Sequence, residues 1–237
     1  MAKTLFPLVS ADVALFSVGE GCLQVLLVQR AQAPEAGHWA LPGAVLKPDI
    51  DRDLEATARR ALRDKIRVEV PHLEQLRTFA GADRDPRGWS LAVLHYALLP
   101  RDQVQAVVNS KVDVVRWANT ETECQHLAFD HSVQLRVARS ALRQRVREHA
   151  LPLHLMPERF TLTQLQNVCE IILAPDIGKG STLDKGAFRR RFAGSQDIVV
   201  APGEFERGAQ RPAQLFRVAP GFRFQREEPT VGQHQNL

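Results

Sequence analysis

Residues 43–68 read GAVLKPDIDRDLEATARRALRDKIRV, and this stretch decides the fold of the chain. Its apolar residues recur every four positions, at Leu54, Ala58, Leu62 and Ile66. Arginine, aspartate and lysine occupy many of the positions between them. Such a spacing is typical of an amphipathic helix that packs one side against a core. The stretch therefore predicts a loop followed by a half-buried helix.

This stretch resembles the box of the Nudix family, which reads G-x5-E-x7-R-E-u-x-E-E-x-G-u with u aliphatic. The preceding segment His38–Gly43, HWALPG, adds to the resemblance. Aligned from its right-hand end, the box places Arg60 at the arginine and puts aliphatic positions at Leu62 and Val68. Arg67 replaces the closing glycine. What the resemblance implies depends on the metal-binding positions of the box.

Two of the three helix carboxylates of that box are missing here. Ala61 stands at the first glutamate, and Asp64 and Lys65 stand at the glutamate pair. These positions share one face of a helix, where a Mg²⁺ ion needs several hard oxygen ligands. The sequence therefore predicts no bound metal, no catalytic residues and a sensor in place of an enzyme. An ordinary amphipathic surface helix is the alternative interpretation.

The loop before the helix also departs from the box. Asp51-Arg52 resembles a two-residue insertion, so the spacing does not fix which residue stands for the first glutamate. That residue is Ile50 or one of Asp49, Asp51 and Asp53.

Composition sets the wider frame. The chain has 237 residues, of which 44% are hydrophobic, and this length predicts two domains. The net charge of +4 does not by itself indicate nucleic-acid binding. Three cysteines without a CxxC pair indicate neither a disulfide framework nor a zinc site. The apolar run 5–16 is too short and interrupted to span a membrane, so we expect a cytoplasmic location.

The N-terminal part, residues 1–150, is predicted to be a Nudix-like ligand-sensing domain. Its strands are expected at 13–18, 22–28, 76–80, 90–98 and 113–117. A helix is expected at 130–148, with one side formed by Val133, Val137, Leu142 and Val146. The predicted fold class is α+β, with an N-terminal α/β/α sandwich around a mixed sheet.

Two prolines in Ala150–Glu158 indicate the domain boundary, and residues 151–220 are predicted to form a winged helix-turn-helix. A helix capped near Thr161 is followed by a loop with Gly178 and Gly180, and then by a basic helix that Asp184 can cap. Short β runs at 198–200 and 215–218 complete this order. Residues 221–237 are predicted to form a disordered tail.

The basic helix 183–192 predicts binding to double-stranded DNA. Phe188 and Phe192, four residues apart, can anchor it to the core, which leaves cationic side chains on its outer surface. The predicted DNA contacts are Lys185, Arg189, Arg190, Arg191 and, between the two β runs, Arg207, Gln210 and Arg211. A solvated cationic face without a nucleic-acid partner is the alternative.

Several segments in order resemble the NrtR family of Nudix-related regulators of NAD metabolism. They include LLVQR at 26–30, RDPRGWS at 84–90, AFDH at 128–131 and AFRRRF at 187–192. The resemblance implies a homodimeric repressor at NAD-biosynthesis genes that responds to ADP-ribose or a related nucleotide and needs no cofactor. An active Nudix hydrolase with a C-terminal interaction domain, and a nucleotide-binding module that docks to protein, are the competing functions.

The resemblance also suggests where the nucleotide binds. Three arginines can hold a diphosphate by charge-assisted hydrogen bonds, and they are Arg30, Arg84 and Arg87. Weaker candidates for the same pocket are Trp39, Phe129, Asp130 and His131.

Overall fold

The computed structural model of the chain describes residues 6–104, 112–148, 150–178, 182–194, 197–206 and 212–222. Side chains 112 and 113 are not described. Three of the predicted DNA contacts, Arg207, Gln210 and Arg211, lie outside the described residues, and so do Gly180 and the tail beyond residue 222.

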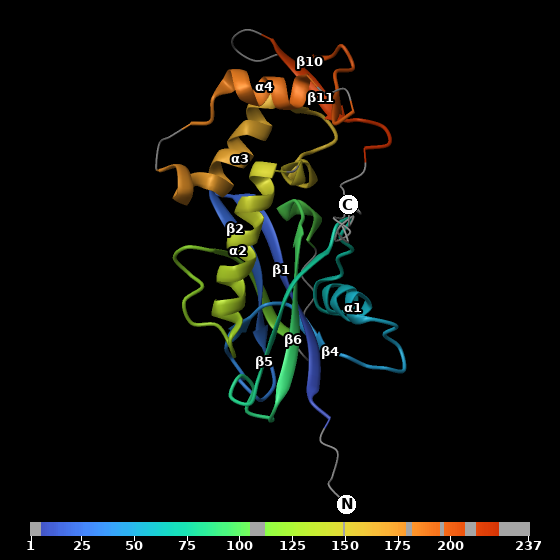
Figure 1. The fold of residues 1–237 in the computed structure, drawn as a ribbon, viewed down its shortest axis with the longest axis vertical. Coiled ribbons are helices and arrows are strands. Elements are labelled where there is room, and N and C mark those ends of the chain that lie inside the picture. Colours follow the sequence, from blue (N-terminus) through green and yellow to red (C-terminus); the bar gives the residue numbers. More distant parts are fainter. Residues whose placement is uncertain are drawn as a thin grey trace, which may run out of the picture.

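A seven-stranded sheet forms the N-terminal part (Figure 1). Its strands are β1 (Leu8–Gly19), β2 (Cys22–Arg30), β3 (Trp39–Ala40), β4 (Gly43–Val45), β5 (Glu74–Gly81), β6 (Ser90–Leu98) and β7 (Val112–Asn119). The main order is β3-β2-β1-β6-β5, with β4 paired to β1 and β7 to β2. The strands β1 and β6 run parallel, whereas the other pairs are antiparallel. The predicted mixed sheet is therefore confirmed.

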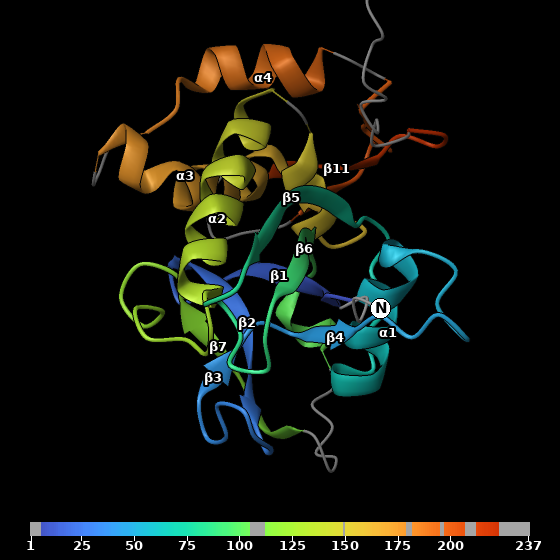
Figure 2. The same cartoon turned by 60° about the horizontal axis from the view of Figure 1, so that its bottom comes forward.

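Two helices cover opposite faces of this sheet, α1 (Leu54–Ile66) and α2 (His131–Glu148), as Figures 1 and 2 show. Side chains alternate along a strand, so β1 serves both faces. Val13 and Leu15 pack in the cluster that contains α1. Phe16 packs in the cluster that contains α2. This arrangement confirms the predicted α/β/α sandwich.

The prediction that Val133 lies on the buried side of α2 is wrong. Val133 is 42% exposed, while the buried side of the helix is formed by Leu135, Ala138, Leu142 and Val146. Each residue turns a helix by about 100°, so Val133 lies half a turn away from Leu142, nine residues later. A valine in the sequence does not by itself show which side is buried.

The C-terminal part contains η2 (Leu151–Leu155), β8 (Phe160–Thr161), α3 (Leu162–Ile177), α4 (Lys185–Ala193), β9 (Val199–Val200), β10 (Phe205–Glu206) and β11 (Ala213–Val218). A further 3-10 helix, η1 (Arg101–Gln103), follows β6. The strand β11 pairs antiparallel with β8, β9 and β10. The predicted winged helix is therefore confirmed.

Both predicted helix caps of this part are present. The Thr161 hydroxyl accepts a hydrogen bond from the Gln164 backbone N–H, and the Gln164 side chain accepts one from the Thr161 N–H. The Asp184 carboxylate accepts from the Ala187 N–H at 2.6 Å. These bonds satisfy backbone donors that a helix start would otherwise leave without partners.

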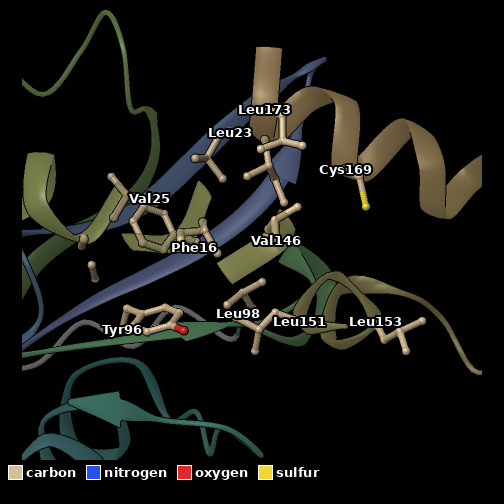
Figure 3. Packing of buried hydrophobic residues seen from close by; sticks show 14 of the residues in the cluster. Phe16, Leu23, Val25, Tyr96, Leu98, Val146, Leu151, Leu153, Cys169 and Leu173 are labelled. Atoms are coloured by element: carbon tan, nitrogen blue, oxygen red, sulfur yellow. The ribbon is translucent and has the colours of Figure 1, made fainter. Parts of the chain in front are cut away.

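The two parts share one hydrophobic cluster (Figure 3). Phe16 and Leu23 of the sheet belong to it together with Cys169 and Leu173 of α3. Arg143 of α2 is 8% exposed and donates from Nε to the Ile172 carbonyl at 3.2 Å. The winged helix thus packs directly on the sheet and on α2, and the boundary at residue 150 stays a prediction.

Among the helices within the described ranges, none combines the length and apolar character needed to cross a bilayer.

Candidate functional site

The helix α1 and the strand β4 lie side by side (Figure 2). Two adjoining cavities lie where the last turns of α1 face β4. The larger has a volume of about 550 Å³ and the smaller about 100 Å³. Both are lined by Arg30, Gly43, Ala44, Val45, Lys65 and Arg87. We call the combined space the cleft. The end of β2 and the loop between β5 and β6 close its other sides.

Asp51 organises the loop that leads into α1. Its carboxylate is buried and accepts from Arg60 Nε and Nη2, each at 2.7 Å. The Thr57 hydroxyl and the Lys47 backbone N–H donate to it at 3.0 and 2.9 Å. The hydrogen bonds from Arg60 are the main reason why the pKa of Asp51 lies far below its usual range. Of the four candidates in this loop, Asp51 is the one that binds the box arginine, whereas Asp53 caps α1.

The backbone at positions 43 and 67 shows why the Nudix box has glycine at both places. Arg67 ends α1 with φ 51° and ψ 42°, the left-handed conformation that glycine adopts most readily. A Cβ atom on Gly43 would lie 2.1 Å from Asp12 Oδ1 and 3.0 Å from the Ala11 carbonyl oxygen. A larger residue at position 43 would therefore force Asp12 to move.

The cleft-facing side of α1 carries Ala61, Asp64 and Lys65. Among the residues lining the larger cavity, Asp64 supplies the one carboxylate, and its Oδ2 lies 3.9 Å from Arg60 Nη1. Within the described ranges, no three His, Cys, Asp or Glu side chains are grouped so that they could hold a metal ion. The residues present therefore do not fit the Mg²⁺ ion that a Nudix hydrolase uses.

The structure brings Arg87 and Arg30 to the cleft. Arg87 donates from Nε and Nη2 to the two oxygens of Asp85, at 3.0 and 2.6 Å. These bonds are the main reason why the pKa of Asp85 is lowered. Arg30 donates from Nε to the Pro34 carbonyl at 2.8 Å, and its Cζ lies 4.7 Å above the Phe129 ring. Burial lowers the pKa of Arg30. Both arginines are held in place before any ligand arrives.

Arg84 and Asp130, both predicted to contact the ligand, bind each other. Arg84 Nε and Nη2 donate to the two carboxylate oxygens at 3.0 and 2.8 Å. Arg84 Nη1 also donates to the Ser90 hydroxyl at 3.1 Å, and its side chain is 10% exposed. Burial opposes the ionisation of Asp130, but the hydrogen bonds from Arg84 and Gln134 outweigh it and lower its pKa. The pair therefore holds the loop between β5 and β6 against the start of α2.

His131 is buried at the floor of the smaller cavity. Its Nδ1 accepts from the Leu41 backbone N–H at 2.9 Å, and its Nε2 lies 3.6 Å from Asp12 Oδ2. Burial lowers the pKa of His131. Asp12 also accepts from Gln134 Nε2 at 3.1 Å. Sequence reasoning missed Asp12, although a carboxylate between Ala11 and Val13 inside an apolar strand is a usable signal of a buried polar network.

Like Asp130, Trp39 is a candidate that lines neither cavity of the cleft. Its ring stacks under Arg116, whose Cζ lies 4.4 Å from the ring centroid, and it packs against the main core cluster. Its position is that of a structural aromatic residue.

The second candidate surface is the outer side of α4. Phe188 and Phe192 are 6% and 1% exposed, with ring centroids 4.8 Å apart, so they anchor the helix. Lys185, Arg189 and Arg190 are exposed. Arg191 is exposed as well, but it donates from Nη1 to the Val146 carbonyl at 3.4 Å, and its Cζ lies 5.2 Å above the Phe192 ring. Arg191 thus turns toward α2, away from the other three cations.

Comparisons with known proteins match both parts of the chain. Residues 7–135 match the NUDIX domain, and residues 152–218 match the NrtR DNA-binding winged helix domain. An Acinetobacter baylyi protein named ADPR responsive transcriptional repressor NtrR is 42% identical over 218 residues, covering 90% of this chain and 82% of that protein.

Two solved structures from Shewanella oneidensis are also similar. NrtR complexed with a 27mer DNA has 34% identity, covers 89% of this chain and 93% of its own, and superposes with a TM-score of 0.77. The NUDIX domain of NrtR complexed with ADP ribose has 38% identity, covers 58% of this chain and 90% of its own, with a TM-score of 0.55.

Proposed function

This chain belongs to the NrtR family of Nudix-related transcriptional regulators, and we propose that it represses NAD-biosynthesis genes in response to ADP-ribose or a related nucleotide. The observation that carries the proposal is that two cationic surfaces lie on parts of the chain that share one hydrophobic core. A cleft lined by cations lies in the Nudix part, and a cationic helix lies on the winged part that packs against it. The named relative and the two Shewanella oneidensis structures support both assignments.

In the cleft we assign the diphosphate to Arg30 and Arg87. Each guanidinium is fixed by bonds within the protein, so binding costs little side-chain entropy. Charge-assisted hydrogen bonds from such groups are about twice as strong as neutral ones. Phe129, which lies under Arg30, offers an aromatic surface to the same ligand. Arg84, Asp130 and His131 hold this wall in place.

Hydrolysis is the competing function, and the cleft argues against it. A Nudix enzyme needs carboxylates on α1 to carry Mg²⁺, and this chain has Ala61 and Lys65 at two of those positions. We expect no metal-dependent cleavage of ADP-ribose over a range of magnesium and manganese concentrations. Chromatography of the products tests this, and turnover on the order of 1 per second would show an enzyme.

On DNA we assign the contacts to Lys185, Arg189 and Arg190 of α4. An α-helix fits the major groove, and cations on its outer side can meet phosphates or guanine edges. Arg191 is a weaker candidate because it turns toward α2. We propose a homodimer on a two-fold symmetric operator, because operator symmetry mirrors protein symmetry. A cytoplasmic location follows from this partner.

The test is binding of the chain to DNA from its own upstream region, measured by fluorescence anisotropy against salt concentration. An Arg189→Ala/Arg190→Ala variant should bind more weakly, and its salt slope should be lower by about one unit for each phosphate that it no longer binds. The matched control is Arg52→Ala/Arg63→Ala, which removes two exposed arginines at α1. Equal affinities and slopes for wild type and the α4 variant would favour protein docking over DNA binding.

The effector is tested separately. ADP-ribose should raise the melting temperature, since a ligand selective for the folded state stabilises it, and should change the affinity for operator DNA. Arg87→Ala should reduce both effects. An unchanged melting temperature at millimolar ADP-ribose would remove this nucleotide as the effector and leave the DNA assignment standing.

A further inference from the structure

Lys65 occupies the place where the fold would otherwise carry a metal ligand. It lies in the last turn of α1, on the same side as Ala61 and Asp64, and it lines both cavities of the cleft. Its charge also reaches the cleft floor, where it contributes to the lowered pKa of the buried His131 after the larger effect of burial. The side chain therefore faces the space in which a diphosphate would bind.

An anion at this end of α1 needs a compensating cation. The last turn of a helix presents backbone carbonyls with partial negative charge, which repel phosphate oxygens and favour a cation. A Nudix hydrolase meets this need with Mg²⁺ held by several carboxylates. Here the carboxylate on this face is Asp64, which lies near Arg60, and the described part of the chain groups no three His, Cys, Asp or Glu side chains around a possible metal ion. A divalent ion therefore lacks the set of carboxylates that holds it in a hydrolase.

Three cations from three separate elements surround the same space. Arg30 comes from the end of β2, Arg87 from the loop between β5 and β6, and Lys65 from α1. The guanidiniums of Arg30 and Arg87 are each fixed by internal hydrogen bonds. Lys65 adds an ammonium with three donors on a flexible four-carbon stem, which meets phosphate oxygens as a point charge.

We infer that Lys65 replaces the divalent metal, so that the cleft binds the diphosphate of its nucleotide without Mg²⁺. The inference rests on the nucleotide site proposed above and adds its charge mechanism. It also distinguishes this chain from a Nudix hydrolase, which binds its substrate together with Mg²⁺. The affinity for the diphosphate is the same with and without divalent ions, because Lys65 supplies the positive charge.

The test is calorimetry of ADP-ribose binding to the full chain in EDTA and in magnesium chloride. Wild type should bind with the same Kd in both buffers, within about twofold. Lys65→Met keeps most of the length of the side chain and removes its charge, so its affinity should fall by about 10- to 100-fold in both buffers, the usual range for a hydrogen bond to a charged group. Lys65→Arg should stay within a few fold of wild type.

Two further variants complete the design. Arg63→Met, an exposed position of the same helix outside the cleft, is the matched control and should bind like wild type. Lys65→Glu places a second carboxylate beside Asp64, so its binding should be lost in EDTA and recover at least tenfold with Mg²⁺. Circular dichroism and melting curves verify that each variant is folded.

Two results would overturn the inference. One is a wild-type affinity at least tenfold higher with Mg²⁺, and the other is a Lys65→Met affinity equal to wild type. Inorganic pyrophosphate in EDTA separates this inference from the choice of effector. If ADP-ribose does not bind but pyrophosphate binds through Lys65, the proposed effector is wrong and the lysine assignment holds. If neither binds without metal, the lysine assignment is wrong.

Discussion

Glu74 joins three elements near the junction of the two parts, and its charge should be measurable in the stability of the protein. Tyr96 Oη and Arg145 Nη2 each donate to its carboxylate at 2.7 Å, and His72 Nε2 lies 3.5 Å away. Burial alone would raise the pKa of Glu74. The nearby His72 ring and the hydrogen bonds from Tyr96 and Arg145 outweigh burial and lower this pKa from 4.5 to about 2.

This difference sets the size of the effect of Glu74→Gln. A difference of one unit between the folded and unfolded pKa values corresponds to about 1.4 kcal/mol. Ionised Glu74 therefore contributes about 3 kcal/mol to the free energy of unfolding at pH 7. Because the folded pKa is the lower one, the contribution is present above the unfolded pKa of 4.5 and is lost as the pH falls toward 2. At pH 3 it should be about half as large.

Urea unfolding of wild type and Glu74→Gln at pH 7, 5, 4 and 3 measures this contribution directly. We expect the variant to be less stable by about 3 kcal/mol at pH 7, with a difference that shrinks at lower pH. Glu69→Gln, at an exposed position of the preceding loop, is the matched control. A difference that does not depend on pH, or one below about 1 kcal/mol at pH 7, would refute the reasoning.

Three other substitutions test the packing that supports the two surfaces. Arg84→Met should cost about 3–5 kcal/mol in urea unfolding because it leaves Asp130 partly buried without its cation; the double variant with Asp130→Asn should recover part of this loss, and additive costs would contradict a coupled pair. Gly43→Ala should weaken ADP-ribose binding in calorimetry, since its Cβ would lie 2.1 Å from Asp12 Oδ1; an unchanged Kd would show that the cleft adapts. Phe192→Ala should cost about 3–5 kcal/mol and reduce DNA affinity, because α4 loses its main anchor; an unaltered melting temperature would speak against this anchor.

Regular periodicity made much of the fold predictable. The helices α1, α3 and α4 begin at a recognisable Asp or Thr cap and bury residues at helical spacing, so the sequence alone places them. The strands β8, β9 and β10 contain two residues each. Such short strands show no alternation, so β3, β4, β8 and β10 are not indicated by the sequence, whereas β9 lies in the apolar run 198–200 that it does indicate.

The candidate site was less predictable, because the type of a residue does not show which other residue it will contact in the fold. Arg84 and Asp130 are both natural ligand contacts by chemistry, yet they are 46 positions apart in the sequence and meet each other in the fold. Trp39 was an equally reasonable stacking residue, but the packing of β2 against β7 brings Arg116 over it. Arg30, Arg87 and Phe129 do lie at the cleft, and their roles toward a ligand stay predictions.

The helix α2 is bonded at both ends to different parts of the molecule. Gln134 donates to Asp12 at the cleft floor, and Arg143, nine residues later, donates to the Ile172 carbonyl of α3. One residue inserted between them would rotate one set of donors by about 100° and move it by about 1.5 Å along the axis relative to the other. Both sets of hydrogen bonds could then no longer form together. Evolution can therefore change the side chains of this segment but not its number of residues, so relatives that keep both parts should show neither insertions nor deletions here.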